Sequence, residues 1–468
     1  MHICLGILCI VGTKSSCIIS SSLNLFNGKI NSIKCSYTKG MRMNINVNFS
    51  GDYSKLVTPE IMSKLEGIQQ GIHTKSAVGA EFLGWVDWPS NISTELVQDI
   101  QQTAQQIRAH SDVLVVIGIG GSYLGSKAVI EALATPFETK ENLEVIFAGH
   151  MVSGEYLKQL MSYLDGKEVS LNVISKSGKT TEPALAFRFL QQYMEKRYGE
   201  QATSRIIVTT DEEKGALLSL AIEKGYKRYV VPNDIGGRYS VFTAVGLLPI
   251  AAAGYDIGKL IGGATKAQQE FSTLDTKNNS AIQYAIIRKH LYDTGYPVEI
   301  MATFDEKLRY IQEWWKQLFG ESEGKEGKGI FPASVVYSTD LHSLGQYIQD
   351  GKRMLFETFL TVEKANEDLT VFEAENDGDE LNYLSGLTLH EFNHACHEAT
   401  ASAHLDGGVP QVSLSIEQID EEHIGYLLYF YMISCAYSAY LLDINPFDQP
   451  GVEDYKNNIF KILKKPGY

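Results

Sequence analysis

The chain has 468 residues, of which 44% are hydrophobic and 21% are charged, a balance typical of a folded protein rather than a disordered one. Its length predicts two or three domains, because single cores stop growing at about 250–300 residues. The formal net charge of -15 argues against a general nucleic-acid binder, whereas a pocket for a small anion needs only a few local donors.

The first 42 residues differ in composition from the rest of the chain. An apolar run at 3–12 has the length of a signal-peptide core, but only His2 precedes it as a candidate positive residue. A weak secretory signal, an organelle address and an upstream start that adds non-native sequence all remain open. We favour the last, because Met41 and Met43 stand just before the first convincing globular segment.

The cysteines are concentrated in the same region. Of the six, only two follow residue 40, and no pair has the CxxC spacing of a zinc or redox site. The main part of the chain is therefore expected to be a reduced, cytoplasmic protein.

From residue 91 the sequence alternates between helical and strand-like segments. The expected strands are a continuous apolar run at 112–117 and further segments at 143–147, 169–174, 204–209 and 228–231. The expected helices cover 91–110, a segment ending at 133, 156–164 and 183–197. This alternation, together with a first strand whose apolar run suits burial on both faces, predicts a doubly wound α/β domain with a parallel sheet.

After the small-residue stretch 246–263 the alternation resumes. Strands are expected at 297–304 and 353–363, and helices at 306–319, 380–402 and 417–442. We therefore predict an α/β protein with two doubly wound parallel-sheet sandwich domains and a helical C-terminal tail. The expected boundaries are an extension at 1–42, domains at 43–265 and 266–440, and a tail at 441–468. No segment after the extension is expected to span a membrane, which takes about 20 apolar residues.

Two loops that follow predicted strands have the composition of phosphate sites. Residues 118–125 (GIGGSYLG) join a buried strand to a helix, where glycines permit close approach and helix N–H groups favour an anion. They match neither the P-loop nor the dinucleotide fingerprint, so a plain tight turn stays an alternative. Residues 175–182 (SKSGKTTE) place four hydroxyls before a helix, whereas simple capping needs one.

With 233–242 (NDIGGRYSVF), these loops carry a resemblance to the sugar-isomerase domain and signature of the glucose-6-phosphate isomerase family. It continues through 320–325 (GESEGK), 340–346 (DLHSLGQ) and 446–452 (PFDQPGV), and it covers the chain from about residue 45 onward. The resemblance, to the bacterial-type branch, implies tandem sugar-isomerase domains. It also implies cofactor-free interconversion of glucose 6-phosphate and fructose 6-phosphate through an enediolate.

Residue roles are carried over from the family's motifs. The resemblance assigns catalysis to Glu321 as the base, Arg238 as the positive charge beside the enediolate, His342 as the ring-opening group and Lys456. It assigns substrate and phosphate binding to Gly121, Ser122, Ser175, Lys176, Ser177, Thr180, Gln317 and Gln449. In relatives the histidine reaches the neighbouring subunit's site, so a homodimer is implied, with no cofactor, no metal, no nucleic acid and no membrane. Lys179 departs from the threonine usual in this branch, which puts phosphate affinity in doubt more than reaction type.

Two other functions compete with this interpretation. Residues 390–394 (HEFNH) match the HExxH pattern of zinc metalloproteases, in which two histidines on one helix face hold the metal. The extended form of that pattern needs a histidine at 400, where Thr400 stands, and relatives lack the motif. Sugar-isomerase domains also serve as phosphosugar sensors, but the DNA-binding module usual in such regulators is not visible here.

Overall fold

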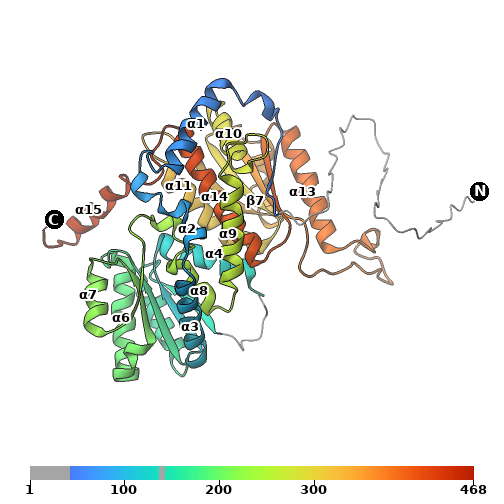
Figure 1. Ribbon diagram of the computed structural model, residues 1–468. Helices are drawn as coiled ribbons and strands as arrows, with labels where there is room; N and C mark the ends of the chain where they lie inside the picture. The colour runs from blue at the N-terminus through green and yellow to red at the C-terminus, as the bar shows by residue number, and fades with distance from the viewer. Residues whose placement is uncertain (1–42, 136, 138–142, 468) are drawn as a thin grey trace, which may run out of the picture. The chain divides into compact units, whose positions relative to one another are not determined.

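The chain divides into two units, Met1–Arg42 and Met43–Tyr468. The computed structural model describes residues 43–135, 137 and 143–467 (Figure 1). The predicted extension at 1–42 lies outside the described residues.

The first sheet has five strands in the order β3-β2-β4-β5-β6, and all of its pairings are parallel. Its strands are β2 (Val113–Ile117), β3 (Glu144–Ala148), β4 (Val169–Ile174), β5 (Ile206–Thr210) and β6 (Lys227–Val230). The accompanying helices are α3 (Thr94–His110), α4 (Leu124–Leu133), α5 (Gly154–Leu164), α6 (Thr181–Tyr198), α7 (Ala216–Lys224) and α8 (Ala244–Ala252). Every residue of β2, β4 and β5 is buried, as the continuous apolar sequence of β2 predicts. The burial includes polar residues of β4 and β5, such as Asn172 and Thr209.

The second sheet also has five strands, in the order β1-β10-β9-β7-β8. Its strands are β7 (Val298–Thr303), β8 (Phe331–Val336), β9 (Leu355–Val362), β10 (Gln411–Ile416) and β1 (Asn46–Phe49). Four of them are mutually parallel, which confirms the predicted fold class, but the edge strand β1 pairs antiparallel with β10. Segment 43–265 thus gives its first strand to the second sheet, and the domain boundaries stay a prediction.

The remaining helices precede the first sheet in the chain or follow it. They are α1 (Pro59–His73), α2 (Trp88–Asn91), α9 (Ile257–Phe271), α10 (Ser280–Asp293), α11 (Arg309–Glu323), α12 (Gly345–Asp350), α13 (Leu389–Asp406), α14 (Glu421–Leu441) and α15 (Val452–Ile462). The helix predicted from residue 380 begins only at Leu389, because Thr388 caps it. The Thr388 hydroxyl accepts the Glu391 N–H, and the Glu391 carboxylate accepts the Thr388 N–H in return.

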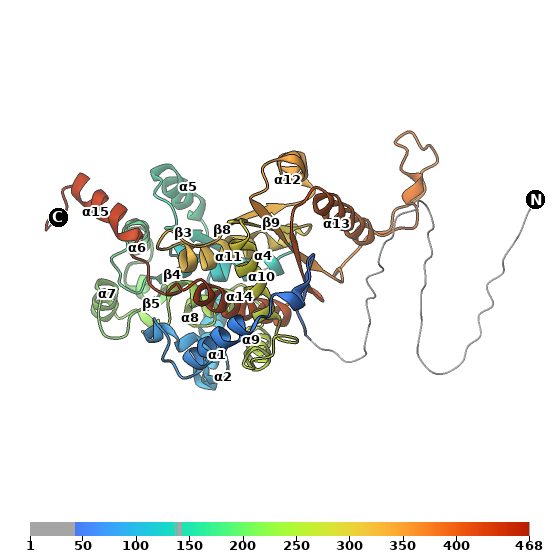
Figure 2. The same cartoon turned by 90° about the horizontal axis from the view of Figure 1, so that it is seen from above.

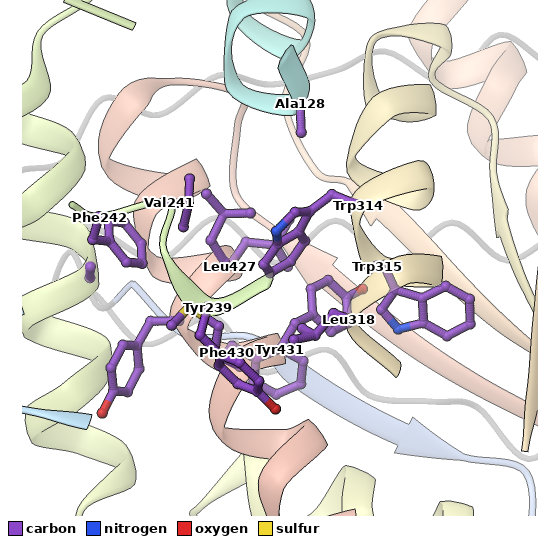
Figure 3. Close-up of a cluster of buried hydrophobic side chains, with 14 of the residues drawn as sticks. Ala128, Tyr239, Val241, Phe242, Trp314, Trp315, Leu318, Leu427, Phe430 and Tyr431 are labelled. Carbon is purple, nitrogen blue, oxygen red and sulfur yellow. The ribbon is translucent and has the colours of Figure 1, made fainter. Parts of the chain in front are cut away.

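Helix α14 is the central helix of the core and packs against α9, α10 and α11 (Figures 1 and 2). By length and apolar composition it could cross a membrane, contrary to the expectation from sequence, but 94% of its most apolar window is buried inside the protein. Figure 3 shows Phe430 and Tyr431 of this helix gathered with Trp314 and Leu318 of α11. Such burial on all sides is that of a core helix.

Candidate active site

The glycine loop after β2 touches two other parts of the predicted site. A Cβ atom added at Gly121 would lie 2.0 Å from the Gly237 carbonyl oxygen and 2.7 Å from the Arg238 nitrogen. Gly120 has a φ of +56°, and a Cβ there would lie 2.7 Å from the Gln317 amide nitrogen. A side chain at either position would clash with the signature segment (233–242) or with α11, so both positions require glycine even without a bound ligand.

Three of the other predicted site residues lie close to the carboxylate of Glu321, near the end of α11. Its Oε2 atom lies 3.1 Å from Nε2 of Gln317, 3.4 Å from Nε2 of Gln449 and 3.7 Å from Nη1 of Arg238. The Glu321 side chain is 31% exposed and that of Arg238 is 1% exposed. The carboxylate is therefore accessible to a substrate, and its position is fixed by hydrogen bonds from Gln317 and Gln449.

The guanidinium of Arg238 is fixed in position by hydrogen bonds to neighbouring residues. Its Nε donates to the hydroxyl of Ser322 at 2.8 Å, and its Nη2 donates to the carbonyl of Pro446. The adjacent Tyr239 ring stacks on Trp85 with centroids 4.8 Å apart. The position of the guanidinium is therefore fixed by several elements, and Ser322 is a contributor that the sequence motifs did not single out.

The hydroxyl-rich loop joins β4 to α6. Ser175 Oγ accepts the Gly178 N–H at 3.1 Å, and Ser177 Oγ accepts the Lys179 N–H at 3.2 Å. Thr180 occupies the N-cap position of α6, but its side chain makes no capping hydrogen bond. The first N–H groups of the helix thus lack a side-chain cap, and free N–H groups of this kind suit an anion.

Lys176 links this loop to the signature segment. Its ammonium donates to the carbonyls of Asn233 at 3.0 Å and Pro232 at 3.3 Å. Burial lowers the pKa of Lys176, while the nearby Asp211 and Asp234 carboxylates act in the opposite direction. The structure therefore gives this lysine a structural contact beside its predicted phosphate role.

Two of the predicted catalytic residues lie apart from the Glu321 cluster. His342 is the exposed last residue of a 3-10 turn (Thr339–His342) after β8. Lys456 Nζ lies 2.9 Å from Glu453 Oε1 within α15, and this hydrogen bond raises the pKa of Lys456. Helix α15 buries none of its residues and projects from the rest of the described chain in Figure 1. The Glu182 carboxylate at the start of α6 also raises the pKa of Lys456. Within 43–135, 137 and 143–467, no hydrogen bond or ion pair joins either residue to Glu321.

The HExxH residues on α13 are engaged in local contacts. Nε2 of His390 lies 3.1 Å from the Glu363 carbonyl oxygen, and Nε2 of His394 lies 3.0 Å from that of Val362. Glu391 closes the capping box already described. The two histidines bind the helix to the end of β9, and Glu391 caps its first turn. All three residues that define the HExxH pattern therefore have structural contacts.

One turn further on, His397 is expected to make stability depend on pH. Burial and the neighbouring His394 lower the pKa of His397 to about 4. Such a group stabilises the fold fully above the unfolded pKa of about 6.5 and loses this contribution as the pH falls toward 4. His397→Asn should therefore reduce the loss of unfolding free energy between pH 7 and pH 5 by about 2 kcal/mol in urea titrations. His73→Asn, at an exposed position, is the control, and equal pH dependence of all three proteins would contradict the expectation.

Two solved structures share the fold of this chain. A hypothetical protein of Thermus thermophilus superposes with a TM-score of 0.79 at 28% identity, over 89% of this chain and 100% of that chain. A glucose-6-phosphate isomerase of Chlamydia trachomatis shares the fold with a TM-score of 0.73 at 19% identity, over 90% of this chain and 89% of that one.

Sequence comparison then identifies the family. The phosphoglucose isomerase family profile matches residues 94–467. A glucose-6-phosphate isomerase of Clostridioides difficile is 50% identical over 436 residues, which are 90% of this chain and 97% of the relative. Another, from Alkaliphilus metalliredigens, is 54% identical over 410 residues, 86% and 91% of the two chains. The chain belongs to the phosphoglucose isomerase family.

Proposed function

We propose that this chain catalyses the reversible isomerisation of glucose 6-phosphate and fructose 6-phosphate, a step of glycolysis and gluconeogenesis, in the cytoplasm and without a cofactor. The observation that carries the proposal is the convergence of Gln317, Gln449 and Arg238 on the Glu321 carboxylate. The relatives described above, at 50% identity or more, bear the name of this enzyme.

Glu321 is the proton-transfer group in this proposal. In the aldose-to-ketose direction its carboxylate removes the proton from C2 of the open-chain sugar, and the electron pair forms an enediolate across C1 and C2. A proton passes from the hydroxyl on C2 to the oxygen on C1, and the Glu321 carboxyl then delivers its proton to C1, which gives the ketose. Arg238, 3.7 Å from that carboxylate, supplies fixed positive charge where the negative charge of the enediolate develops.

The sugar and its phosphate have separate sets of donors and acceptors. The buried amide oxygen of Gln317 has no hydrogen-bond partner among the described residues, and a sugar hydroxyl would donate to it. The phosphate would lie at the start of α6, where it is bound by the N–H groups of the helix and by Ser175, Lys176, Ser177 and Thr180. Gly121 and Ser122 of the glycine loop complete the proposed substrate contacts.

The direct test is conversion of fructose 6-phosphate to glucose 6-phosphate by the purified chain in the presence of EDTA. We expect rapid conversion that EDTA does not reduce. A folded protein that binds the sugar phosphate without converting it would overturn the proposal and favour a phosphosugar-binding role. Activity that EDTA abolishes would contradict the cofactor-free mechanism.

We further propose a homodimer in which His342 reaches the site of the partner subunit and assists ring opening, with Lys456 as a second catalytic group. The exposed position of His342, separate from the Glu321 cluster of its own chain, supports a role at a neighbouring site. Closed two-fold symmetry would then give each dimer two shared sites.

Mixing two inactive variants tests the exchange of His342. In a heterodimer of Glu321→Gln and His342→Asn chains, one site would contain both an intact glutamate and an intact partner histidine. Random reassociation of equal amounts should therefore restore about a quarter of wild-type activity. If His342 acts within its own chain, every site of the mixture lacks one group and activity stays at the level of the single variants.

A further inference from the structure

Directly behind the base, a fully buried arginine joins two carboxylates. Arg288 of α10 has no exposed side-chain surface, and neither do Glu299 of β7 and Glu323 of α11. Arg288 Nε lies 2.7 Å from Glu299 Oε2, and both Nη atoms donate to Glu323, Nη2 at 3.1 Å from Oε2. The Nη1 atom also donates to the Ser438 hydroxyl of α14.

The group contains two carboxyl groups for one guanidinium. Glu299 accepts further hydrogen bonds from the hydroxyls of Thr358, at 2.5 Å, and Tyr284. Burial by itself lowers the pKa of Arg288, but Glu299 and Glu323 raise it well above its usual value, so the guanidinium is charged. Buried ion pairs contribute little to net stability compared with apolar side chains of similar volume. Stability alone therefore does not explain why Arg288, Glu299 and Glu323 are buried together.

The role follows from the last turn of α11, where three consecutive residues make three different contacts. Glu321 presents its carboxylate to Gln317 and Arg238, Ser322 accepts from Arg238 Nε, and Glu323 is bound in a bidentate manner by Arg288. Since the three residues share one turn, a rotation that moves Glu323 also moves Glu321.

We propose that Arg288 and Glu323 are positioning residues for the isomerisation, which hold the last turn of α11 so that the Glu321 carboxylate keeps its place beside Arg238. The inference rests on the proposed role of Glu321 as the base. Ser438 and Glu299 tie this pair to α14 and to β7, so the base is fixed to the core of the second sheet rather than to a loop. Misplacement of a reacting group by about 1 Å lowers a rate by about 100-fold.

The test compares kcat, KM and ligand binding in two variants of Glu323. Glu323→Gln loses the bidentate pair with Arg288, and we expect kcat to fall by about 10- to 100-fold while KM stays nearly constant. The dissociation constant of sorbitol 6-phosphate, which has the phosphate but no carbonyl, should also stay nearly constant. Glu323→Asp keeps the charge and the fold but shortens the link by one carbon, and it should lower kcat by about tenfold with the same KM.

Glu357→Gln is the matched control. Glu357 of β9 is equally buried, and it is bonded to His404 at 2.8 Å and to the Tyr337 hydroxyl at 2.6 Å. Its variant should lose thermal stability without a selective fall in kcat. Wild-type kcat in both Glu323 variants, or a kcat change no larger than in the control, would overturn the positioning role.

Glu321→Gln is measured in the same series to separate the two proposals. If Glu321→Gln is inactive and the Glu323 variants are fully active, only the positioning role fails. If Glu321→Gln is fully active, the proposed base fails, and a fall in kcat in the Glu323 variants then points to another group on this turn.

Discussion

Glu321→Gln is expected to lower kcat for conversion of fructose 6-phosphate by about 1,000-fold or more, the contribution typical of a general base. Glutamine keeps the size of the side chain, and its amide oxygen can still accept from Gln317 beside the Arg238 guanidinium. It cannot take up the proton from carbon, so the step fails although the sugar phosphate still binds. Steady-state kinetics should therefore show a large fall in kcat with KM nearly unchanged.

The control for this variant lies on the same helix. Glu313 of α11 is 40% exposed and pairs with Lys316 at 2.6 Å, which is three residues further along. Exposed pairs of this kind contribute little, so Glu313→Gln should keep wild-type kcat and KM. A Glu321→Gln enzyme that retains a tenth or more of wild-type kcat would exclude Glu321 as the base.

Gly263→Ala is expected to cause the largest loss of stability, because α9 and α14 approach each other at this residue without room for a side chain. A Cβ at Gly263 would lie 1.9 Å from the Glu422 carbonyl oxygen and 3.0 Å from the Tyr426 nitrogen, both backbone atoms of α14. The helices must separate to admit it, which should lower the free energy of unfolding by about 3 kcal/mol or more. Urea unfolding followed by circular dichroism measures the change.

The neighbouring glycine supplies the comparison. A Cβ at Gly262 would meet no atom within 4 Å, and alanine favours a helix over glycine by about 1 kcal/mol. Gly262→Ala should therefore unfold at the same or a higher urea concentration than the wild type. If both variants unfold alike, the close approach of α9 and α14 is not what limits stability.

The parts of the fold that could be predicted are those with a distinct local signal. The apolar run at 113–117 marked β2 because strands of a covered parallel sheet are mostly apolar along their length. Helix α10 (Ser280–Asp293) was missed because it is buried on nearly all sides, so its sequence lacks a polar face. Strand β8 (Phe331–Val336) was missed because its exposed start and Pro332 weaken the strand pattern.

The site was predictable to the extent that its residues lie in recognisable motifs. Glu321, Arg238 and Gln317 were named from the sequence, but their convergence on one carboxylate oxygen depends on how α11 packs against the signature segment. Arg288 lies outside every motif, and Ser322 lies within 320–325 but was not assigned a role there. A lone arginine is most often a surface residue, and only the burial of this one identified it.

The antiparallel pairing of β1 (Asn46–Phe49) with β10 (Gln411–Ile416) has a consequence for biosynthesis. β1 is the first of the described strands to leave the ribosome, and its partner is the last. The edge of the second sheet therefore cannot close until nearly the whole chain has been made, and β1 must wait with its backbone groups unpaired. Contacts of such long sequence separation form slowly. If the chain were cut between the first and the second sheet, β1 would remain on the N-terminal fragment, whereas its partner β10 would be on the C-terminal one.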